Sequence, residues 1–426
     1  MFHDRALQAK AADPRPRSAV SHGVGIAGLA GIAAWIAVAK RHQLDGPYSA
    51  LVNLLACAAP MALWSLLVDK VHRSHSTGID WANPKPWRET LDVSLAKLAG
   101  LWATWGAIAL IYATGRFYWQ GGFRFAMWCF TQAAPALFVL SIPYVLWIDR
   151  RLVEPRDGAY QLGAWLMGQP HDAEPIRAHL RSWAVKAFFL AFMLAITPAG
   201  FGDLIRSGWR DALGSPAALA GLLITLMFVV DVAFASVGYV LTMRPLDSHI
   251  RSANPHAAAW AAALICYPPF LLMAAGGPLD YHPGTQGDRS WLHWFDGHPI
   301  LLAAVGALLV ALTAVYAWAT VAFGMRFSNL THRGVVTHGP YAWSRHPAYL
   351  SKNLFWWLST LPFLSTAGLV EGARATLLLG AVSGVYYWRA KTEERHLRED
   401  PAYLEYDAWM ARNGPVPRFF AWMRGG

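Results

Sequence analysis

The sequence predicts an all-α fold, a polytopic helical membrane protein with about ten transmembrane helices. Of its 426 residues, 55 % are apolar and only 15 % are charged, whereas soluble proteins carry about 25 % charged residues. Apolar runs of roughly 20 residues recur along the chain, and a helix of this length crosses a hydrocarbon core of about 30 Å. The 22 Trp and 15 Tyr residues agree with aromatic belts at both membrane interfaces.

Ten stretches have this length and composition. They cover about residues 23–39, 49–68, 94–114, 126–148, 184–202, 216–242, 257–276, 299–325, 348–364 and 370–388. Lys and Arg favour alternate connections by about three to one, which predicts an even number of spans with both termini in the cytosol. The same distribution explains the net charge of +10 without nucleic-acid binding, because the basic residues are spread over short loops.

Polar residues mark the connections and some of the spans. The acidic connection at 277–298 is expected to lie outside, and Asp172 is a candidate cap for a short surface helix. Lys97 and Lys186, near span ends, are predicted to extend toward the interface. Asp231 lies near the middle of the sixth span, where a charge is costly, so a functional role and a structural pairing are equally open.

The chain is predicted to have three parts: a cytosolic leader (1–22), an N-terminal multi-span region (23–295) and a motif-bearing membrane core (296–426). The leader lacks the short apolar segment and cleavage site of a signal peptide. Cys57, Cys129 and Cys266 lie far apart within apolar runs, so we expect buried hydrophobes and no disulfide or metal set.

The most distinctive stretch is the polar loop Val336–Tyr349, which reads VTHGPYAWSRHPAY. Gly339 and Pro340 predict a turn, and Pro347 biases the preceding residue toward an extended conformation. Pro347 is therefore expected at the first position of the ninth span. The free amides of that helix start, together with Arg345, form a candidate anion pocket at the membrane surface. The rings of Tyr341, Trp343 and Tyr349 offer faces for a purine.

A second polar cluster follows the tenth span. Glu393 and Glu394 occupy a helix C-terminus, where cationic residues are the better complement to the helix dipole. Helix stability therefore does not explain the pair, which can hold an ammonium or sulfonium group or pair with Lys391 and Arg395. Because the ninth and tenth spans form a hairpin, we expect both clusters on one face of the membrane.

These motifs, with Tyr403-Leu-Glu-Tyr406, resemble the isoprenylcysteine carboxyl methyltransferase family over about residues 300–420. The resemblance implies an integral-membrane methyltransferase that binds S-adenosylmethionine at the cytosolic face. The residues implied in cofactor binding are His338, Gly339, Tyr341, Arg345, His346, Pro347, Tyr349, Glu393, Glu394 and Tyr406. Of these, Arg345, Glu394 and Tyr349 are the implied catalytic residues. The sequence departs from the family pattern at Ser351, where Gly is common, and at Asp400-Pro401, where Phe-Gly is usual.

The implied reaction is methyl transfer to a lipid or lipidated acceptor of carboxylate or thiol type, which enters from the bilayer. Membrane lipids are the expected partners, and the bacterial inner membrane or an equivalent membrane is the expected location. The acceptor and the oligomeric state stay open.

Two other functions fit parts of the sequence. The span count and the C-terminal core also resemble NADPH-dependent sterol reductases, although Ala348, Ser351 and Glu393 differ from the residues usual there. A non-catalytic transporter or scaffold would favour broken spans in matching halves, and only the Pro268-Pro269 pair offers one. No metal site is predicted, because the His residues at 72, 75, 332 and 338 do not form the full set of paired ligands of a di-iron site.

Overall fold

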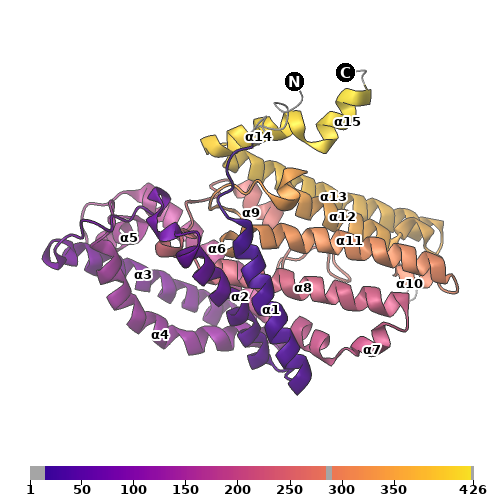
Figure 1. The fold of residues 1–426 in the computed structure, drawn as a ribbon. Coiled ribbons are helices and arrows are strands. Elements are labelled where there is room, and N and C mark those ends of the chain that lie inside the picture. Colours follow the sequence, from indigo (N-terminus) through magenta and orange to yellow (C-terminus); the bar gives the residue numbers. More distant parts are fainter. Residues whose placement is uncertain (1–14, 285–289, 424–426) are drawn as a thin grey trace, which may run out of the picture.

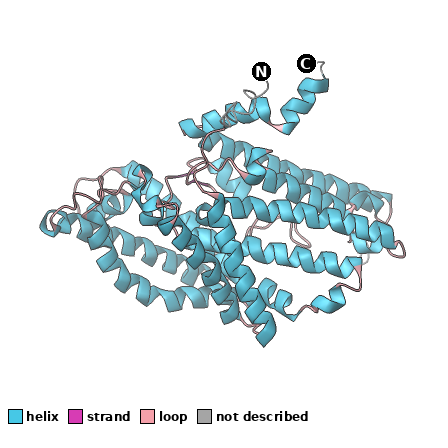
Figure 2. Ribbon diagram, in the orientation of Figure 1, coloured by secondary structure: helices cyan, strands magenta, loops and turns pink. Residues whose placement is uncertain are grey.

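The computed structural model describes residues 15–284 and 290–423, and in this part of the chain helices dominate (Figures 1 and 2). Two short strands, β1 (Ser252–Ala253) and β2 (Thr331–His332), pair antiparallel. The predicted all-α class is confirmed. Most of the predicted leader, residues 1–14, lies outside the described residues, as do Asp288 and its immediate neighbours in the acidic connection.

Seven helices have the length and apolar composition to cross a membrane. They are α1 (His22–His42), α2 (Pro47–Leu67), α3 (Trp87–Gly115), α4 (Arg124–Asp149), α6 (Ala173–Arg206), α8 (Pro216–Val240) and α11 (Pro299–Phe323). Each coincides with a predicted span. These helices support a multi-pass membrane protein.

The other described helices are shorter or more polar. Between the spans lie α5 (Gly158–Leu166), α7 (Trp209–Ala212), α9 (Ala257–Leu264) and α10 (Trp291–Trp294). The C-terminal part adds α12 (Pro347–Thr360), α13 (Leu369–Leu397), α14 (Pro401–Asn413) and α15 (Pro415–Met423).

The predicted count of ten spans is not confirmed. In place of a continuous span at 257–276 the structure has α9, which contains 8 residues. It ends before Pro268-Pro269, two residues that have no backbone N–H to continue a helix. The 14 residues of α12 reach only about 21 Å, short of a bilayer core. With 29 residues α13 is long enough, but charges near both its ends set it apart from the seven apolar helices.

Two local predictions also need correction. Asp172 does cap a helix, because its carboxylate accepts a hydrogen bond from the amide of Glu174. This helix, however, is the 34-residue α6 and not a short surface helix. Lys97 reaches the end of α4 but is not exposed there: it is 5 % exposed and pairs with Asp149 at 2.5 Å and Asp157 at 3.0 Å. A buried cation needs such partners, so the Lys97 cluster joins α3 to α4.

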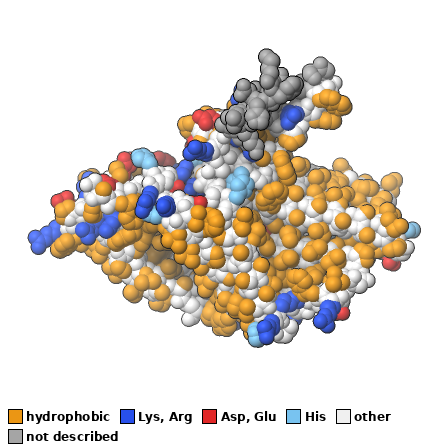
Figure 3. Space-filling model, in the orientation of Figure 1, with side chains coloured by type: hydrophobic (Ala, Val, Ile, Leu, Met, Phe, Trp, Pro, Cys, Tyr) orange, Lys and Arg blue, Asp and Glu red, His pale blue; other side chains and the backbone are white. Residues whose placement is uncertain are grey.

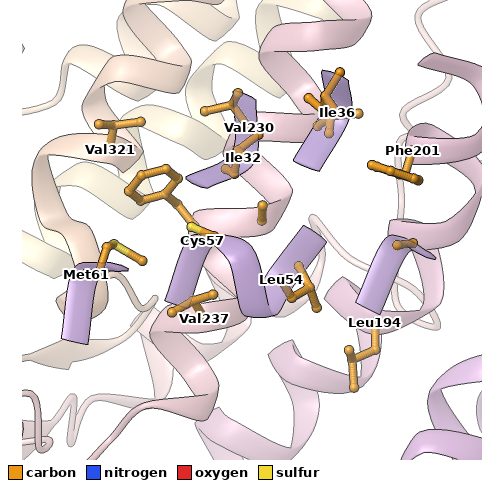
Figure 4. Packing of buried hydrophobic residues seen from close by; sticks show 14 of the residues in the cluster. Ile32, Ile36, Leu54, Cys57, Met61, Leu194, Phe201, Val230, Val237 and Val321 are labelled. Carbon is orange, nitrogen blue, oxygen red and sulfur yellow. The ribbon is translucent and has the colours of Figure 1, made fainter. Parts of the chain in front are cut away.

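The largest apolar core joins both parts of the chain. Ile32 of α1, Cys57 of α2, Leu194 of α6, Val230 of α8 and Val321 of α11 belong to one cluster (Figure 4). Close helix packing depends on small residues, since a Cβ at Gly31 would lie 1.8 Å from the carbonyl oxygen of Ala56. The N-terminal helices thus support α11, which carries one wall of the C-terminal part.

The flank of the molecule is strongly apolar. Figure 3 shows hydrophobic side chains over most of the visible flank, with Lys and Arg toward its borders. Leu110, Val139 and Leu377 are 63 %, 65 % and 73 % exposed. Lipid is the natural surrounding of so much exposed apolar surface, because in water it would favour association.

The C-terminal helices lie side by side, with α14 and α15 across one end of α13 (Figure 1). Buried Arg333 fixes the connection between α11 and α12. Its guanidinium donates to the carbonyls of Gly238 at 2.7 Å, Leu241 at 3.1 Å and Phe327 at 3.0 Å, and also to that of Ser248. Arg333 therefore satisfies carbonyls at the C-terminus of α8 that have no partner within the helix.

Candidate functional site

A cavity lies where α11, α12 and α13 meet the 326–346 connection and α14. Six of the predicted site residues line it: Tyr341, Arg345, His346, Tyr349, Glu393 and Tyr406. They come from the loop, from α12, from α13 and from α14, so the fold gathers residues that are far apart in sequence.

The polar loop has the predicted local structure. Gly339 opens the short 3-10 helix η7 (Gly339–Ala342) with a φ of 60°, a left-handed conformation that glycine adopts most easily. A Cβ there would also meet the Trp318 ring at 3.0 Å. His346 is extended, with a φ of −131°, and Pro347 is the first residue of α12. The prediction of a helix entry at Pro347 is confirmed.

The loop and the glutamate pair meet, as the hairpin predicts. His346 Nε2 lies 3.1 Å from Glu394 Oε1, and the Tyr349 hydroxyl donates a hydrogen bond to Glu393. The His346 and Tyr349 rings are stacked, with an angle of 4° between their planes. These contacts tie the first turn of α12 to the last turns of α13 and fix the spacing of the two clusters.

Glu394 is a buried anion. Its burial opposes ionisation, but hydrogen bonds from His346 and Lys391 and the charge of Arg345 outweigh this effect and lower its pKa to about 2. Lys391 Nζ lies 2.9 Å from the carboxylate, and Arg345 Nε lies 3.8 Å from it. Glu394 therefore keeps its negative charge at neutral pH and organises the cations around it.

Arg345 is bound on its other side by Asp407 of α14, which the sequence analysis did not single out. Asp407 also pairs with Arg398 at 3.0 Å. Burial disfavours the charged guanidinium, but Glu394 and Asp407 outweigh it, so the pKa of Arg345 is raised. The directly adjacent Tyr406, already part of the quoted motif, was the only signal pointing to Asp407.

Tyr406 holds α14 against the loop. Its hydroxyl donates to the carbonyl oxygen of Tyr341 at 2.7 Å, and the side chain is 2 % exposed. A buried Tyr normally finds such a partner. Tyr406 lines the cavity and positions the backbone of the loop.

Four predicted residues do not line the cavity: His338, Gly339, Pro347 and Glu394. Gly339 and Pro347 shape the backbone, and Glu394 acts behind the lining through His346. Burial, with smaller contributions from His22 and Arg15, lowers the pKa of His338 to about 4. His338 is therefore neutral at pH 7.

An N-terminal segment, residues 15–21, lies against the loop. The amide of Ala19 donates to the carbonyl of Val335 at 2.8 Å, and Thr337 Oγ1 donates to the carbonyl of Pro16 at 2.8 Å. His338 Nδ1 lies 2.8 Å from Ser18 Oγ. The predicted leader thus ends in a segment that supports the candidate site.

Sequence reasoning missed the lining residues Lys352 and Arg389, and it quoted Tyr403 in a motif without assigning it to the site. Helical spacing was the available signal. Lys352 follows Tyr349 by three residues and Arg389 precedes Glu393 by four, so each shares a helix face with a predicted residue. Asp231 was left open, and the structure shows a hydrogen bond of 2.5 Å from Thr320 of α11. That bond gives Asp231 a structural partner.

Residues 300–399 match the model of the isoprenylcysteine carboxyl methyltransferase family. This segment contains α11, the polar loop, α12, α13 and the glutamate pair. The resemblance read from the sequence is confirmed for this part of the chain. No curated protein and no solved structure matches the chain.

Proposed function

We propose that the chain is an integral-membrane methyltransferase that transfers a methyl group from S-adenosylmethionine to a lipid or lipidated acceptor of carboxylate or thiol type. One observation carries the proposal: Arg345 and His346 meet Glu393 and Glu394 beside a cavity, inside the segment that matches a methyltransferase family.

The residues present suit such a donor. Glu393 would hold its ammonium group, Arg345 its carboxylate, and the rings of Tyr341 and Tyr349 its purine. Among the described residues the buried Tyr403 hydroxyl has no hydrogen-bond partner. Because buried polar groups are rarely left unpaired, a polar ligand in the cavity would satisfy it.

The bound cofactor supplies a methyl group on a positively charged sulfur. The transfer would break the carbon–sulfur bond and leave its electron pair on sulfur, while the acceptor oxygen or sulfur would supply the pair for the new bond. The protein contributes mainly alignment and exclusion of water. Glu393, held by Tyr349, faces the cavity directly, whereas Glu394 is a positioning residue that acts through His346 and Arg345.

The site is proposed to open at the cytosolic face, with the acceptor arriving from the bilayer. The distribution of Lys and Arg supports the cytosolic opening. The exposed apolar side chains on the flank support the arrival of the acceptor from the bilayer.

Calorimetry on detergent-solubilised protein tests the cofactor. We expect S-adenosylhomocysteine to bind and Glu393→Gln to weaken this binding by about tenfold or more, because a charge-assisted hydrogen bond is lost. Glu371→Gln is the control, since Glu371 lies near the opposite end of α13 and pairs with Arg374. Binding of NADPH in place of S-adenosylhomocysteine would assign the site to the reductase class. Binding of neither would leave the transporter or scaffold.

A further inference from the structure

The part of the cavity deeper in the helix bundle contains two cations, Lys352 of α12 and Arg389 of α13. Lys352 follows the first residue of α12, Pro347, by five positions, which is about 7.5 Å along the helix. Arg389 lies one helical turn before Glu393, on the side away from the helix end. Both cations are therefore displaced from the Arg345 and His346 end of the cavity toward the apolar interior.

Aromatic rings surround both charges. Lys352 Nζ lies 5.4 Å from the Tyr316 ring, 5.2 Å from the Trp356 ring and 5.7 Å from the Tyr386 ring. The same Tyr386 ring lies 5.1 Å from the Arg389 guanidinium.

Two more rings complete the surroundings of Arg389: Tyr349 at 5.0 Å and Tyr267 at 5.6 Å. Ring faces attract cations, but they supply neither a full counter-charge nor a hydrogen-bond acceptor.

Neither cation has an acidic partner within 4.0 Å among the described residues. Arg389 Nη2 donates to Asn329 Oδ1 at 3.2 Å, while its buried Nε has no partner in the part of the chain that the structure describes. Asp231 attracts Lys352 from a distance, but its hydrogen-bond partners are Thr320 and Tyr316. A buried arginine with an unused donor and a partly buried lysine, both next to a cavity, are the complement of an anion.

We propose that Lys352 and Arg389 form a subsite that anchors an acid group, a carboxylate or a phosphate, on the amphiphilic acceptor. This inference rests on the proposed function, because it assigns the acceptor of the same site. The surrounding rings suit the apolar part of such a molecule. Cations draw electron density from the oxygens that they hold, so the anchored acid is a binding group, separate from the atom that receives the methyl group.

Direct binding of simple amphiphiles tests the subsite without requiring turnover. Dodecanoate, dodecyl phosphate and dodecanol share one chain, and native mass spectrometry in a nonionic detergent measures their affinity for the whole protein. Comparing each anion with the alcohol removes the contribution of the chain. We expect at least one of the two anions to bind about tenfold more tightly than dodecanol, and the stronger anion identifies the acid.

Lys352→Met and Arg389→Met are expected to abolish this preference for the anion while leaving dodecanol binding unchanged. Lys186→Met is the matched control, because Lys186 lies 3.1 Å over the Trp183 ring and outside the cavity. An unchanged preference in both cavity variants would overturn the proposal. If the two variants lose only S-adenosylhomocysteine binding, the proposal is also overturned, because the cations would then bind the methyl donor and not the acceptor. If the wild type does not bind S-adenosylhomocysteine, the methyltransferase is rejected. The anion measurement still tests the Lys352 and Arg389 subsite, because it does not require the cofactor.

Discussion

Three buried or partly buried histidines carry no charge at neutral pH, and one of them, His396, lines the cavity. Burial is the main cause that lowers the pKa of His249, His338 and His396 to about 4 each, and cationic or imidazole neighbours add to it. His396 is 3 % exposed, and its Nε2 lies 2.9 Å from Ser252 Oγ, which links α13 to β1. Protonation would place a charge inside this contact.

Acidification is therefore expected to destabilise the fold through these groups. The unfolded chain takes up protons near the ordinary histidine pKa of about 6.5, whereas the folded chain does so only near pH 4. Stability thus falls as the pH drops through this window. Thermal unfolding at pH 6.5 and 4.5 measures the loss.

His396→Gln, which keeps a hydrogen-bonding group, is expected to make the pH dependence shallower. The exposed His171→Gln is the control. Equal pH slopes in all three proteins would contradict the prediction. The Glu394 carboxylate does not interfere, because its contribution is lost only below about pH 4.5, as the pH falls toward its folded pKa of about 2.

Among single residues, the sequence identified the polar loop and the glutamate pair, because their spacing and the position of Pro347 are local features. The sequence did not identify Asp407, Lys352 and Arg389 as site residues, because their place in the site depends on how α12, α13 and α14 rotate and pack. The sequence left open which glutamate of the pair faces the cavity, because the answer depends on the rotation of α13, and Glu393 lines it.

Among the elements, the connection after α11 depends on Arg333. Arg333→Met is expected to destabilise the protein by about 3 kcal/mol or more, because each buried polar group left unpaired costs about 1–3 kcal/mol. The carbonyls of Gly238, Phe327 and Ser248 would lose this donor. Denaturant or thermal unfolding in detergent measures this change.

Arg177→Met provides the comparison, since Arg177 is 62 % exposed and forms a surface pair with Glu174. Such pairs contribute about 0–1 kcal/mol. A similar loss of stability in both variants would show that the carbonyl contacts of Arg333 carry no special weight.

Hydropathy predicted the seven apolar helices, because their length and composition are properties of the chain alone. It failed at α9, where the apolar run 257–276 continues past the helix end at Leu264 into turns. Composition records how apolar a segment is, and backbone geometry decides whether it stays helical. Asp172 was recognised as a cap because capping is a local signal, whereas the length of α6 depends on the backbone geometry of the whole segment.

The whole molecule has an apolar flank between two polar ends, and the proposed function requires the α14 end to face the cytosol. Impermeant maleimide labelling of single-cysteine variants tests this orientation. Leu44→Cys, in the α1–α2 connection, is expected to react in intact cells, and Glu405→Cys, exposed on α14, only after permeabilisation. Cys57, Cys129 and Cys266 are replaced by Ala in both. The reverse pattern would place the site on the outer face.

The contact between residues 15–21 and the polar loop has a consequence for biosynthesis. Ser18 and Thr337, which are hydrogen-bonded, are 319 positions apart. At about 5–20 residues per second, a ribosome needs roughly 15–65 s to make the second partner after the first. During that time the early helices are already in the membrane, while Ser18 still lacks its hydrogen-bond partner Thr337. A nascent chain therefore completes the wall of its site only once the loop has been made, and a product that stops before the loop never does.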